Sequence, residues 1–468
     1  MNYILPVLVV FSLFIVLGIL IKPIFGIYLI IISIILESFY IIILDANLKI
    51  PYILVLIVLI GMLFQLLLKA KLTLKFNYYQ KIILVFLLIS FISILYSPKK
   101  LDSFKSVLLY FFFVSILITI SFYINSLDRL KKAINILMIV IIFASLFGFL
   151  QLISEVIFKS QMLYPNSTGY MTLARIPQKF RPPSLFVEAD QFGKFNMVFL
   201  LFFLPFLNKK EFSKQISFTL LRITFYFSLL SLIIAQTRSA WLGFSAGLLH
   251  YILINIKNKK INFKIIIKII MPVIIFLLVL FLLSPTVFEQ LIERSAGILN
   301  VEVGSNSGIT RIIATKSMLD LVISSPKNIF FGLGTGSLNY YGPKYAQIGI
   351  WPQFMGKLGG GAFSLYVNIL FNIGLLGLFV FLIFIFKFYQ INLKVKKNLE
   401  IQNSNSIFSC IITGSILSFT GILVSSIVAD SVNVTYFWVL LGLNSAAINI
   451  IEMENEHESI NTKQNKFI

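Results

Sequence analysis

Apolar runs of membrane-spanning length follow one another along almost the whole chain. A helix needs about 20 apolar residues to cross a bilayer, and its backbone groups must be paired internally because the bilayer core holds no water. Thirteen such runs lie at about residues 3–21, 24–44, 51–68, 82–97, 107–125, 133–153, 195–207, 217–236, 240–256, 265–283, 364–386, 406–428 and 434–450. Only Lys22 and Pro23 separate the first two runs, so one of these is a partial or re-entrant element if the count is twelve. The sequence therefore predicts an all-α fold, a polytopic membrane helix bundle of 12–13 transmembrane helices.

Composition excludes the main alternatives to a membrane bundle. The 468 residues are 58% hydrophobic and 12% charged, whereas soluble domains are about 25% charged. The short alternating segments of a membrane β-barrel are missing. The net charge of +21 is carried by lysines in short connections between apolar runs, which is typical of membrane topology rather than of nucleic-acid binding. We expect the lipid bilayer, and no nucleic acid, as a partner.

Cysteine and histidine usage limits the chemistry. Cys410 is the single cysteine, so an internal disulfide and a CxxC motif are excluded. His250 lies inside an apolar run and His457 in the C-terminal tail, and no His/Glu metal motif is present. We expect no metal and no other cofactor. The N-terminal segment has no basic region and no obvious cleavage site, so we interpret it as a retained span.

The lysine-rich connections set the orientation. They contain Lys69, Lys71, Lys75 and Lys81; Arg129, Lys131 and Lys132; Lys209, Lys210 and Lys214; Lys257, Lys259, Lys260 and Lys264; and Lys387, Lys394, Lys396 and Lys397. All fall on one side of the predicted bundle, which is cytoplasmic by the positive-inside rule. The connection with Lys99, Lys100 and Lys105 falls outside, as an exception. Residues 1–450 form one transmembrane domain, and residues 451–468 are a short cytoplasmic tail that we expect to be disordered.

Two long loops, at about residues 154–194 and 284–363, then face outward. Loops of this length usually carry function or are disordered. Within the second loop, part of the sequence is patterned like an amphipathic helix that lies along the outer membrane surface. Its apolar positions Ile312, Ile313, Met318, Leu319 and Val322 gather toward one side. Any chemistry is therefore expected on the outer face.

Two arginines stand out on that face. Arg238 lies at an outer junction between two spans, in AQTRSAWLGF. It is either a guanidinium held for an anion or an arginine that reaches to lipid phosphates. Arg311 lies near the start of the amphipathic helix, where the helix dipole disfavours a cation and a bound anion would relieve it. The alternative is an ordinary surface arginine.

A third cluster occupies ARIPQKFRPPSLFVEADQFGKF, just before a span. Arg175 and Arg181, with Lys179, are candidate phosphate ligands. Glu188 and Asp190 are candidates for a general base. The alternative is a solvated polar loop with a Pro-rich turn.

GLGTGS at residues 332–337 is not a nucleotide loop. It lacks the GxGxxG spacing and the Walker lysine, and it lies on the outer face, where no ATP pool exists. Its glycines favour a tight turn or a close approach of the backbone to a ligand.

Four segments, in this order, resemble the O-antigen ligase and O-antigen polymerase (Wzy-type) superfamily. RPPSLFVEADQFGKF resembles the motif that opens a span in that superfamily, and TRSAWLGF resembles its Ser/Thr-Arg-x-x-Trp segment. Arg311 with SSPKNIFFGLGTGSLNYY resembles its Arg and Pro-x-x-Gly-x-Gly stretch. SLYVNILFNIGLLG resembles its Asn-x-Tyr-Leu and Gly-Leu-Leu-Gly span. The resemblance covers residues 180–380.

The resemblance implies a metal-independent glycosyltransferase on the outer face of the bacterial cytoplasmic (inner) membrane. The donor would be a glycan linked to undecaprenyl diphosphate, held by Arg238 and Arg311. Planar guanidinium groups suit the charge that builds on a diphosphate leaving group. The product would be O-antigen of lipopolysaccharide, a capsule or an exopolysaccharide, and a chain-length regulator protein is a further implied partner.

One departure bears on the type of transfer. Ligases of this superfamily carry a histidine where this chain has Phe363, in GGGAFSLY. No imidazole base is then available, which favours a polymerase over a ligase, with Glu188 as the preferred base and Asp190 next. Tyr340, Tyr341 and Tyr366 are candidates to bind sugar.

The third hypothesis, after a polymerase and a ligase, is a polysaccharide flippase or other transporter, which is not an enzyme. Transporters commonly have two similar halves and polar groups near the bilayer midplane. Here Glu37 is the main polar group within a span, and the two halves differ in loop length.

Overall fold

A computed structural model describes most of the chain. The residues described are 4–43, 46–68, 76–160, 163, 180–208, 217–257, 263–296, 307–349, 364–401, 407–430 and 432–464. Arg175, Lys179 and Phe363 therefore lie outside the described residues.

Almost all of the described chain is helical. The long helices are α1 (Ile4–Ile21), α2 (Pro23–Ser33), α3 (Ile50–Leu68), α4 (Tyr78–Ile92), α5 (Lys100–Tyr123), α6 (Leu127–Phe158), α8 (Ala189–Phe203), α9 (Phe218–Ile234), α10 (Arg238–Lys257), α11 (Phe263–Leu283), α16 (Leu365–Ile401), α17 (Ile407–Ser425) and α18 (Thr435–Gln464). Short elements are η1 (Ile34–Leu36), η2 (Ser93–Tyr96), η3 (Leu204–Asn208), α12 (Pro285–Ala296), α13 (Ser307–Ile323), α14 (Pro326–Phe331) and α15 (Leu338–Gln347). Strands β1 (Tyr40–Ile43) and β2 (Ala46–Lys49) pair antiparallel.

The predicted polytopic helix bundle is confirmed. Within the described ranges, nine helices are long and apolar enough to cross a membrane, and four more apolar helices are shorter. The four are Ser12–Ile21 and Pro23–Leu36 at the N-terminus, then Phe218–Ile234 and Ile270–Leu283. The pair at the N-terminus agrees with a partial element there, because α2 ends at Ser33 and only one turn of η1 follows it.

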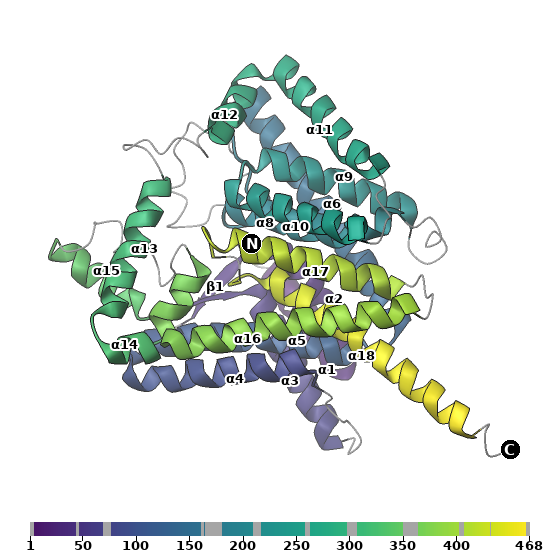
Figure 1. Cartoon of the computed structure of the whole chain (residues 1–468), viewed down its shortest axis with the longest axis vertical. Coiled ribbons are helices and arrows are strands. Elements are labelled where there is room, and N and C mark those ends of the chain that lie inside the picture. The colour runs from purple at the N-terminus through teal and green to yellow at the C-terminus, as the bar shows by residue number, and fades with distance from the viewer. Residues whose placement is uncertain are drawn as a thin grey trace.

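Helix α8 is the centre of the bundle. Every residue from Phe192 to Phe203 is buried, and the helix packs against α9, α10 and α17. Figure 1 shows α8 and α10 beside α17, with α11 and α12 at the periphery. A helix that is apolar all round belongs inside a large core, so the first turn of α8 is held at the middle of one end of the bundle.

Two boundary predictions were wrong. The second span was predicted to reach residue 44, but β1 begins at Tyr40 and pairs with β2. Hydropathy does not distinguish a β-branched strand from a span, so isoleucines 41–43 were counted as part of the helix. The tail was predicted to be disordered, but α18 continues as a helix to Gln464.

The amphipathic helix predicted in the second long loop is confirmed as α13. Its buried face differs from the prediction, because Ala314, Met318 and Val322 are buried. Ile312 is 61% exposed and Ile313 39% exposed, so these two lie off that face. Residues at a spacing of four share one face of a helix, and the buried set follows that spacing.

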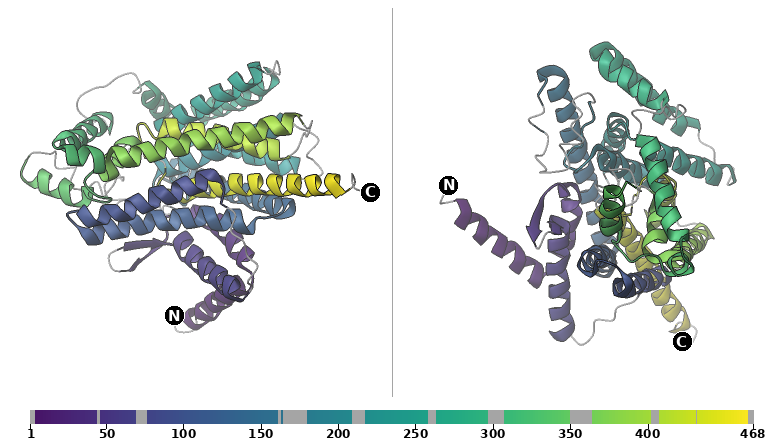
Figure 2. Two further views of the ribbon diagram at one scale, coloured as in Figure 1. Left: turned by 60° about the horizontal axis from the view of Figure 1, so that its bottom comes forward. Right: turned by 90° about the vertical axis from the view of Figure 1, so that its left-hand side faces the viewer.

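The described lysines of these connections, such as Lys81 near the start of α4 and Lys397 near the end of α16, lie toward one end of the bundle, and we call the opposite end the outer end. Figure 1 and the left view of Figure 2 both show α14 and α15 at the outer end, with the C-terminus at the other end. A break in α16 fixes this outer unit to the bundle. Gly374 has φ of 65°, which is not helical, and the carbonyls that the break releases accept hydrogen bonds from the GLGTGS segment, by Leu333 N–H to Phe371 O and Gly334 N–H to Asn372 O, both at 2.8 Å.

Candidate functional site at the outer end

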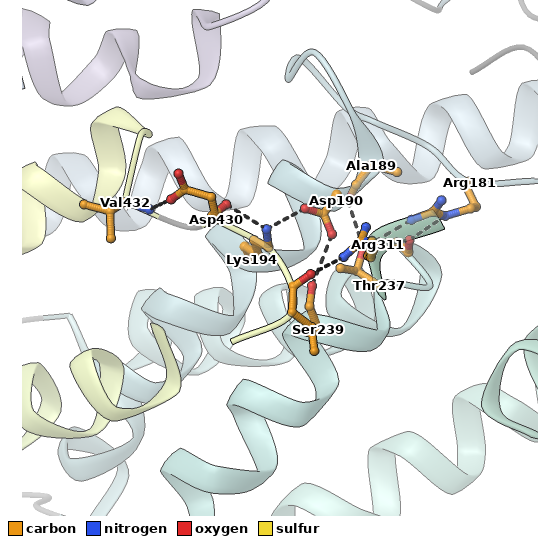
Figure 3. A network of polar contacts seen from close by, with 11 residues as sticks. Arg181, Ala189, Asp190, Lys194, Thr237, Ser239, Arg311, Asp430 and Val432 are labelled. Atoms are coloured by element: carbon orange, nitrogen blue, oxygen red, sulfur yellow. Dashed lines mark hydrogen bonds and ion pairs between the residues drawn. The ribbon is translucent and has the colours of Figure 1, made fainter. Parts of the chain in front are cut away.

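A charged network lies at the first turn of α8 (Figure 3). Lys194, whose side chain is 3% exposed, forms an ion pair with Asp190 at 2.6 Å. The lysine also donates to the backbone carbonyl of Asp430 at 3.1 Å, and Ser239 on α10 donates to the other oxygen of Asp190 at 3.2 Å. These contacts join three separate parts of the chain: α8, α10 and the α17–α18 connection.

The TRSAW motif is a rigid turn between α9 and α10. Gln236 has φ of 48°, an uncommon left-handed conformation for a non-glycine residue. Thr237 donates to the carbonyl of Ala189 at 3.1 Å, and the indole of Trp241 donates to Leu232 on α9 at 3.0 Å. The motif therefore fixes Arg238 at the first position of α10, over the start of α8.

Glycine 193 allows α8 to approach this turn. A Cβ added at Gly193 would lie 2.7 Å from the side-chain oxygen of Thr237 and 3.3 Å from the Cβ of Ala235. Only a residue without a side chain fits there. Within FGKF, Gly193 therefore allows close packing, and Lys194 supplies the charge of the ion pair.

The RPPSLFVE segment is tied to α6. The backbone N–H of Ser184 donates to Gln151 at 2.8 Å, and Gln151 returns a bond to the Ser184 carbonyl at 2.9 Å. The hydroxyl of Ser184 donates to Ala144 at 2.6 Å. Arg181, at the start of this segment, donates to the carbonyl of Ala235 at 3.2 Å and reaches Thr237 at 3.5 Å.

Arg311 brings α13 to the same place. Its guanidinium donates to the carbonyl of Val428, in the turn that follows α17, at 2.6 Å. Figure 3 shows Arg311 beside Asp190 and Ser239, and Arg181 reaching toward Thr237. Arg311 is far from the other site residues in sequence, so its position depends on how α13 packs on the bundle.

Arg181, Arg238 and Arg311 lie close enough to one another for their charges to interact. Burial lowers the pKa of Arg181, Asp190 and Glu188 oppose this shift, and Arg238 and Arg311 add to it. The guanidinium stays charged because an arginine pKa is far above neutral pH. Like charges gathered at a half-buried place repel one another unless anions lie among them, and an anionic ligand would supply further compensation.

The two acidic residues of the site differ. Asp190 is held between Lys194 and Ser239. Glu188 is exposed at the N-cap position of α8 and makes no cap bond with its side chain. The surrounding protein raises the pKa of Glu188 by desolvation, Asp190 raises it further, and Lys194, Arg181 and Arg311 act against this. A raised pKa with access to solvent suits a general base.

The sequence reasoning missed Lys194 and Asp430 as site residues. The carboxylate of Asp430 accepts from Asn433 at 2.7 Å, from Asn368 at 3.1 Å and from Val432 N–H at 3.1 Å. Burial raises the pKa of Asp430. Two signals were present: an Asp and a Lys four residues apart at the start of an apolar run, and an isolated Asp between two spans.

The predicted sugar-binding tyrosines separate into two places. Tyr340 and Tyr341 lie together on α15, with ring centroids 5.1 Å apart. Tyr366 lies between α16 and α17, where its hydroxyl donates to the carbonyl of Leu423 at 3.0 Å. The structure does not bring Tyr366 to the α15 pair.

Neither histidine is near the network. Nδ1 of His250 lies 2.8 Å from the Thr420 hydroxyl. The residue is twelve positions along α10 from Arg238, about 18 Å at 1.5 Å per residue. His457 lies near the other end of α18, which begins at the outer end with Thr435. In the part of the chain that the structure describes, no group of three or more His, Cys, Asp or Glu side chains is arranged to hold a metal ion.

The fold and the site together define a polytopic helical membrane protein with a cationic site at one end of the bundle. Residues 223–382 match the family model described as O-antigen ligase. The match runs from α9 into α16 and includes Arg238, Arg311 and the GLGTGS segment. The match supports the resemblance to the O-antigen ligase and polymerase superfamily that the motifs indicated. The comparison with curated proteins gives no match.

Proposed function

We propose that the protein is a polymerase of lipid-linked polysaccharide repeat units, acting on the outer face of the cytoplasmic membrane. The observation that carries this proposal is the gathering of Arg181, Arg238 and Arg311 around the first turn of α8, with Glu188 beside them. The donor is a glycan on undecaprenyl diphosphate, and the arginines hold its diphosphate. The repeat units belong to O-antigen, a capsule or an exopolysaccharide.

The transfer replaces one carbon–oxygen bond by another. Glu188 accepts the proton of the acceptor hydroxyl, whose oxygen attacks the anomeric carbon of the donor. The bond from that carbon to the diphosphate breaks, and the leaving diphosphate takes the electron pair. Arg238 and Arg311 stabilise the charge that develops on it, because preorganised donors act most strongly on charge that appears in the transition state. Arg181 and Asp190 contribute to binding of the substrate.

We choose a polymerase over a ligase because of the residue type that can act as the general base. Both histidines of the chain are at a distance from the network, in the half of the bundle with the lysine-rich connections. A carboxylate is therefore the base that the site offers. The name of the matched family model, O-antigen ligase, favours the alternative in which the glycan is transferred to a different acceptor.

Deletion of the gene tests the proposal and its alternatives. A polymerase mutant loses the ladder of surface polysaccharide on gels, while single repeat units remain attached to their anchor. Loss of all glycan-bearing anchor, with polymer still on the carrier lipid, would establish the ligase. Accumulation of intermediates on the cytoplasmic face would overturn both enzyme readings in favour of a flippase. A chain-length regulator protein is a proposed partner, and it would co-purify with the chain from crosslinked membranes.

A further inference from the structure

Three tyrosines and a lysine gather on α15, at the outer end of the bundle. Helix α15 lies farthest toward the outer end in Figure 1 and in the left view of Figure 2. Its sequence, LNYYGPKYAQ, contains Tyr340, Tyr341, Lys344 and Tyr345. We call these four residues the tyrosine surface. The segment that leads into α15 is attached to the outer end of α4, because the backbone N–H of Thr335 donates to the Ser93 hydroxyl at 3.0 Å.

The four side chains form a connected group. The rings of Tyr341 and Tyr345 stack with centroids 5.8 Å apart and an interplanar angle of 9°. Tyr340 meets Tyr341 edge to face at 5.1 Å. The exposed ammonium of Lys344 lies 5.3 Å from the centroid of the Tyr340 ring and donates to its hydroxyl at 3.3 Å. The three tyrosines are half-buried, so part of each side chain faces water.

Hydrogen bonds connect the tyrosine surface to the charged site at the first turn of α8. Gly336, just before α15, donates its N–H to the side-chain oxygen of Asn372 at 3.0 Å. Asn372 donates to Asn368 at 2.7 Å, and Asn368 donates to Asp430 at 3.1 Å. An unbroken chain of hydrogen bonds therefore runs from the start of α15 to the α17–α18 connection. The edge contact of Tyr341 with Phe371 at 6.3 Å adds a second attachment to α16.

Close packing at Gly332 also fixes the position of the GLGTGS segment on α16. A Cβ added at Gly332 would lie 2.6 Å from backbone atoms of Asn372, Ile373 and Gly374. Backbone atoms cannot move aside as a flexible side chain does, so the two segments have a single relative position. Anything bound to the tyrosine surface is therefore held at a fixed distance from the first turn of α8.

We propose that the tyrosine surface binds saccharide units of the glycan that extend beyond the bond being formed, and that it sets the length of the polymer. A sugar ring presents apolar C–H groups on its faces and hydroxyls around its edge. Tyrosine presents an apolar ring and a hydroxyl, and it loses little conformational freedom on binding. The ligand class is a water-exposed oligosaccharide, and this inference rests on the proposed function.

Length analysis of the surface polysaccharide tests the inference. In a strain carrying Tyr340→Ala with Tyr345→Ala, the modal chain length falls by about twofold or more, because the chain leaves sooner. Each lost ring contact weakens oligosaccharide binding by roughly fivefold. Chain lengths are compared at equal consumption of the lipid-linked single unit by isolated membranes, so that a slower first transfer is not counted as a shorter chain. The pair Tyr340→Leu and Tyr345→Leu keeps apolar bulk and gives the same shortening if the protein is equally abundant.

The chain offers a matched control. Tyr78 is 61% exposed and also has a lysine over its ring, Lys387 at 5.3 Å, but it lies at the end with the lysine-rich connections. Tyr78→Ala leaves chain length unchanged. Binding is measured with the purified full-length protein and oligosaccharides released by partial hydrolysis from the strain's own surface polysaccharide.

Two results would overturn the inference. One is a wild-type length distribution and wild-type oligosaccharide affinity in the Tyr340/Tyr345 variants. The other is loss of the first transfer in a variant of normal abundance, because the surface would then belong to the transfer site. Failure of the proposed function is seen separately, in a deletion strain that keeps its polymer.

Discussion

Two polar clusters lie inside the same bundle and differ in kind. Near the end with the lysine-rich connections, Tyr79 donates to Asn444 at 3.1 Å, and Asn444 donates to Asn392 at 2.6 Å. This amide cluster is uncharged, and its donors and acceptors satisfy one another across α4, α16 and α18. The cluster at the outer end contains arginines, a lysine and carboxylates, and it includes the exposed Glu188.

This difference distinguishes polar groups that hold helices together from charged groups that serve binding or catalysis. Amides and hydroxyls between apolar helices associate those helices at a small energetic gain. Charges in such a place are costly and are found mainly where they serve binding or catalysis. The amide cluster should therefore contribute to stability alone, and the outer cluster to transfer. Substitutions in both clusters test this contrast.

The largest expected effect is that of Glu188→Gln. Loss of a general base lowers the transfer rate by about 10²–10⁴-fold. The wild-type rate should also fall as the pH decreases through the pKa of Glu188, because the carboxylate must be deprotonated to accept a proton. Since desolvation by the surrounding protein and the charge of Asp190 raise that pKa, the decrease begins at a higher pH than for an ordinary glutamate.

The measurement is the rate of consumption of the lipid-linked donor by membrane vesicles at a series of pH values. Asp190→Asn is the comparison, because this carboxylate is already engaged by Lys194. An unchanged acidic limb in Glu188→Gln would assign the base to another residue.

Replacement of either arginine should have the next largest effect. Loss of one preorganised donor to the developing charge costs about 10²–10³-fold in rate, so Arg238→Ala and Arg311→Ala should each nearly abolish transfer. Arg→Lys keeps the charge but loses the planar fork, so it restores part of the rate. Arg222 on α9, whose guanidinium lies over the Phe218 ring at 4.3 Å, is the matched control.

The same vesicle assay measures the arginine variants, with immunoblots to compare their abundance in the membrane. A wild-type rate in Arg238→Ala or Arg311→Ala would refute the role in binding diphosphate. Arg222→Ala should transfer at the wild-type rate.

Lys194→Met should act mainly through stability. Removal of one member of a buried ion pair costs about 3–5 kcal/mol, because the other charge is left uncompensated. The double variant Lys194→Met with Asp190→Leu removes both charges and should recover most of the loss in thermal unfolding of the detergent-solubilised protein. Transfer should stay low in the double variant, since the link to Asp430 is gone. Equal stability of the single and double variants would contradict a buried pair.

The site could be predicted in its parts but not in its assembly. The motifs around Arg181, Arg238 and Arg311 were recognisable because each combines a charge with an unusual local sequence. Lys194 was missed because a lysine inside FGKF looks like part of an interfacial segment, and its burial arises from the packing of α8 against α10 and α17. The distance between Arg311 and α8 depends on α13, which no local pattern positions.

The fold was predictable to the level of spans. Hydropathy located the helices, because a bilayer demands length and apolar character. It could not locate the β1–β2 hairpin, because the first strand, YIII, has the same apolar residues as a span. It also gave no hint of the break at Gly374, because this depends on the hydrogen bonds that Leu333 and Gly334 make to α16.

The smallest expected effect is that of Asn444→Ala in the amide cluster. Hydrogen bonds between membrane helices average about 0.6 kcal/mol and reach about 1.7 kcal/mol, so the thermal stability of the purified protein should decrease modestly. Asn392→Ala should give a similar decrease, and the double variant should lose less than the sum, because the two amides bond each other. Transfer per molecule should not change in any of the three. A reduced transfer rate at wild-type abundance would mean that the amide cluster is coupled to the outer site, and the contrast between the two clusters would fail.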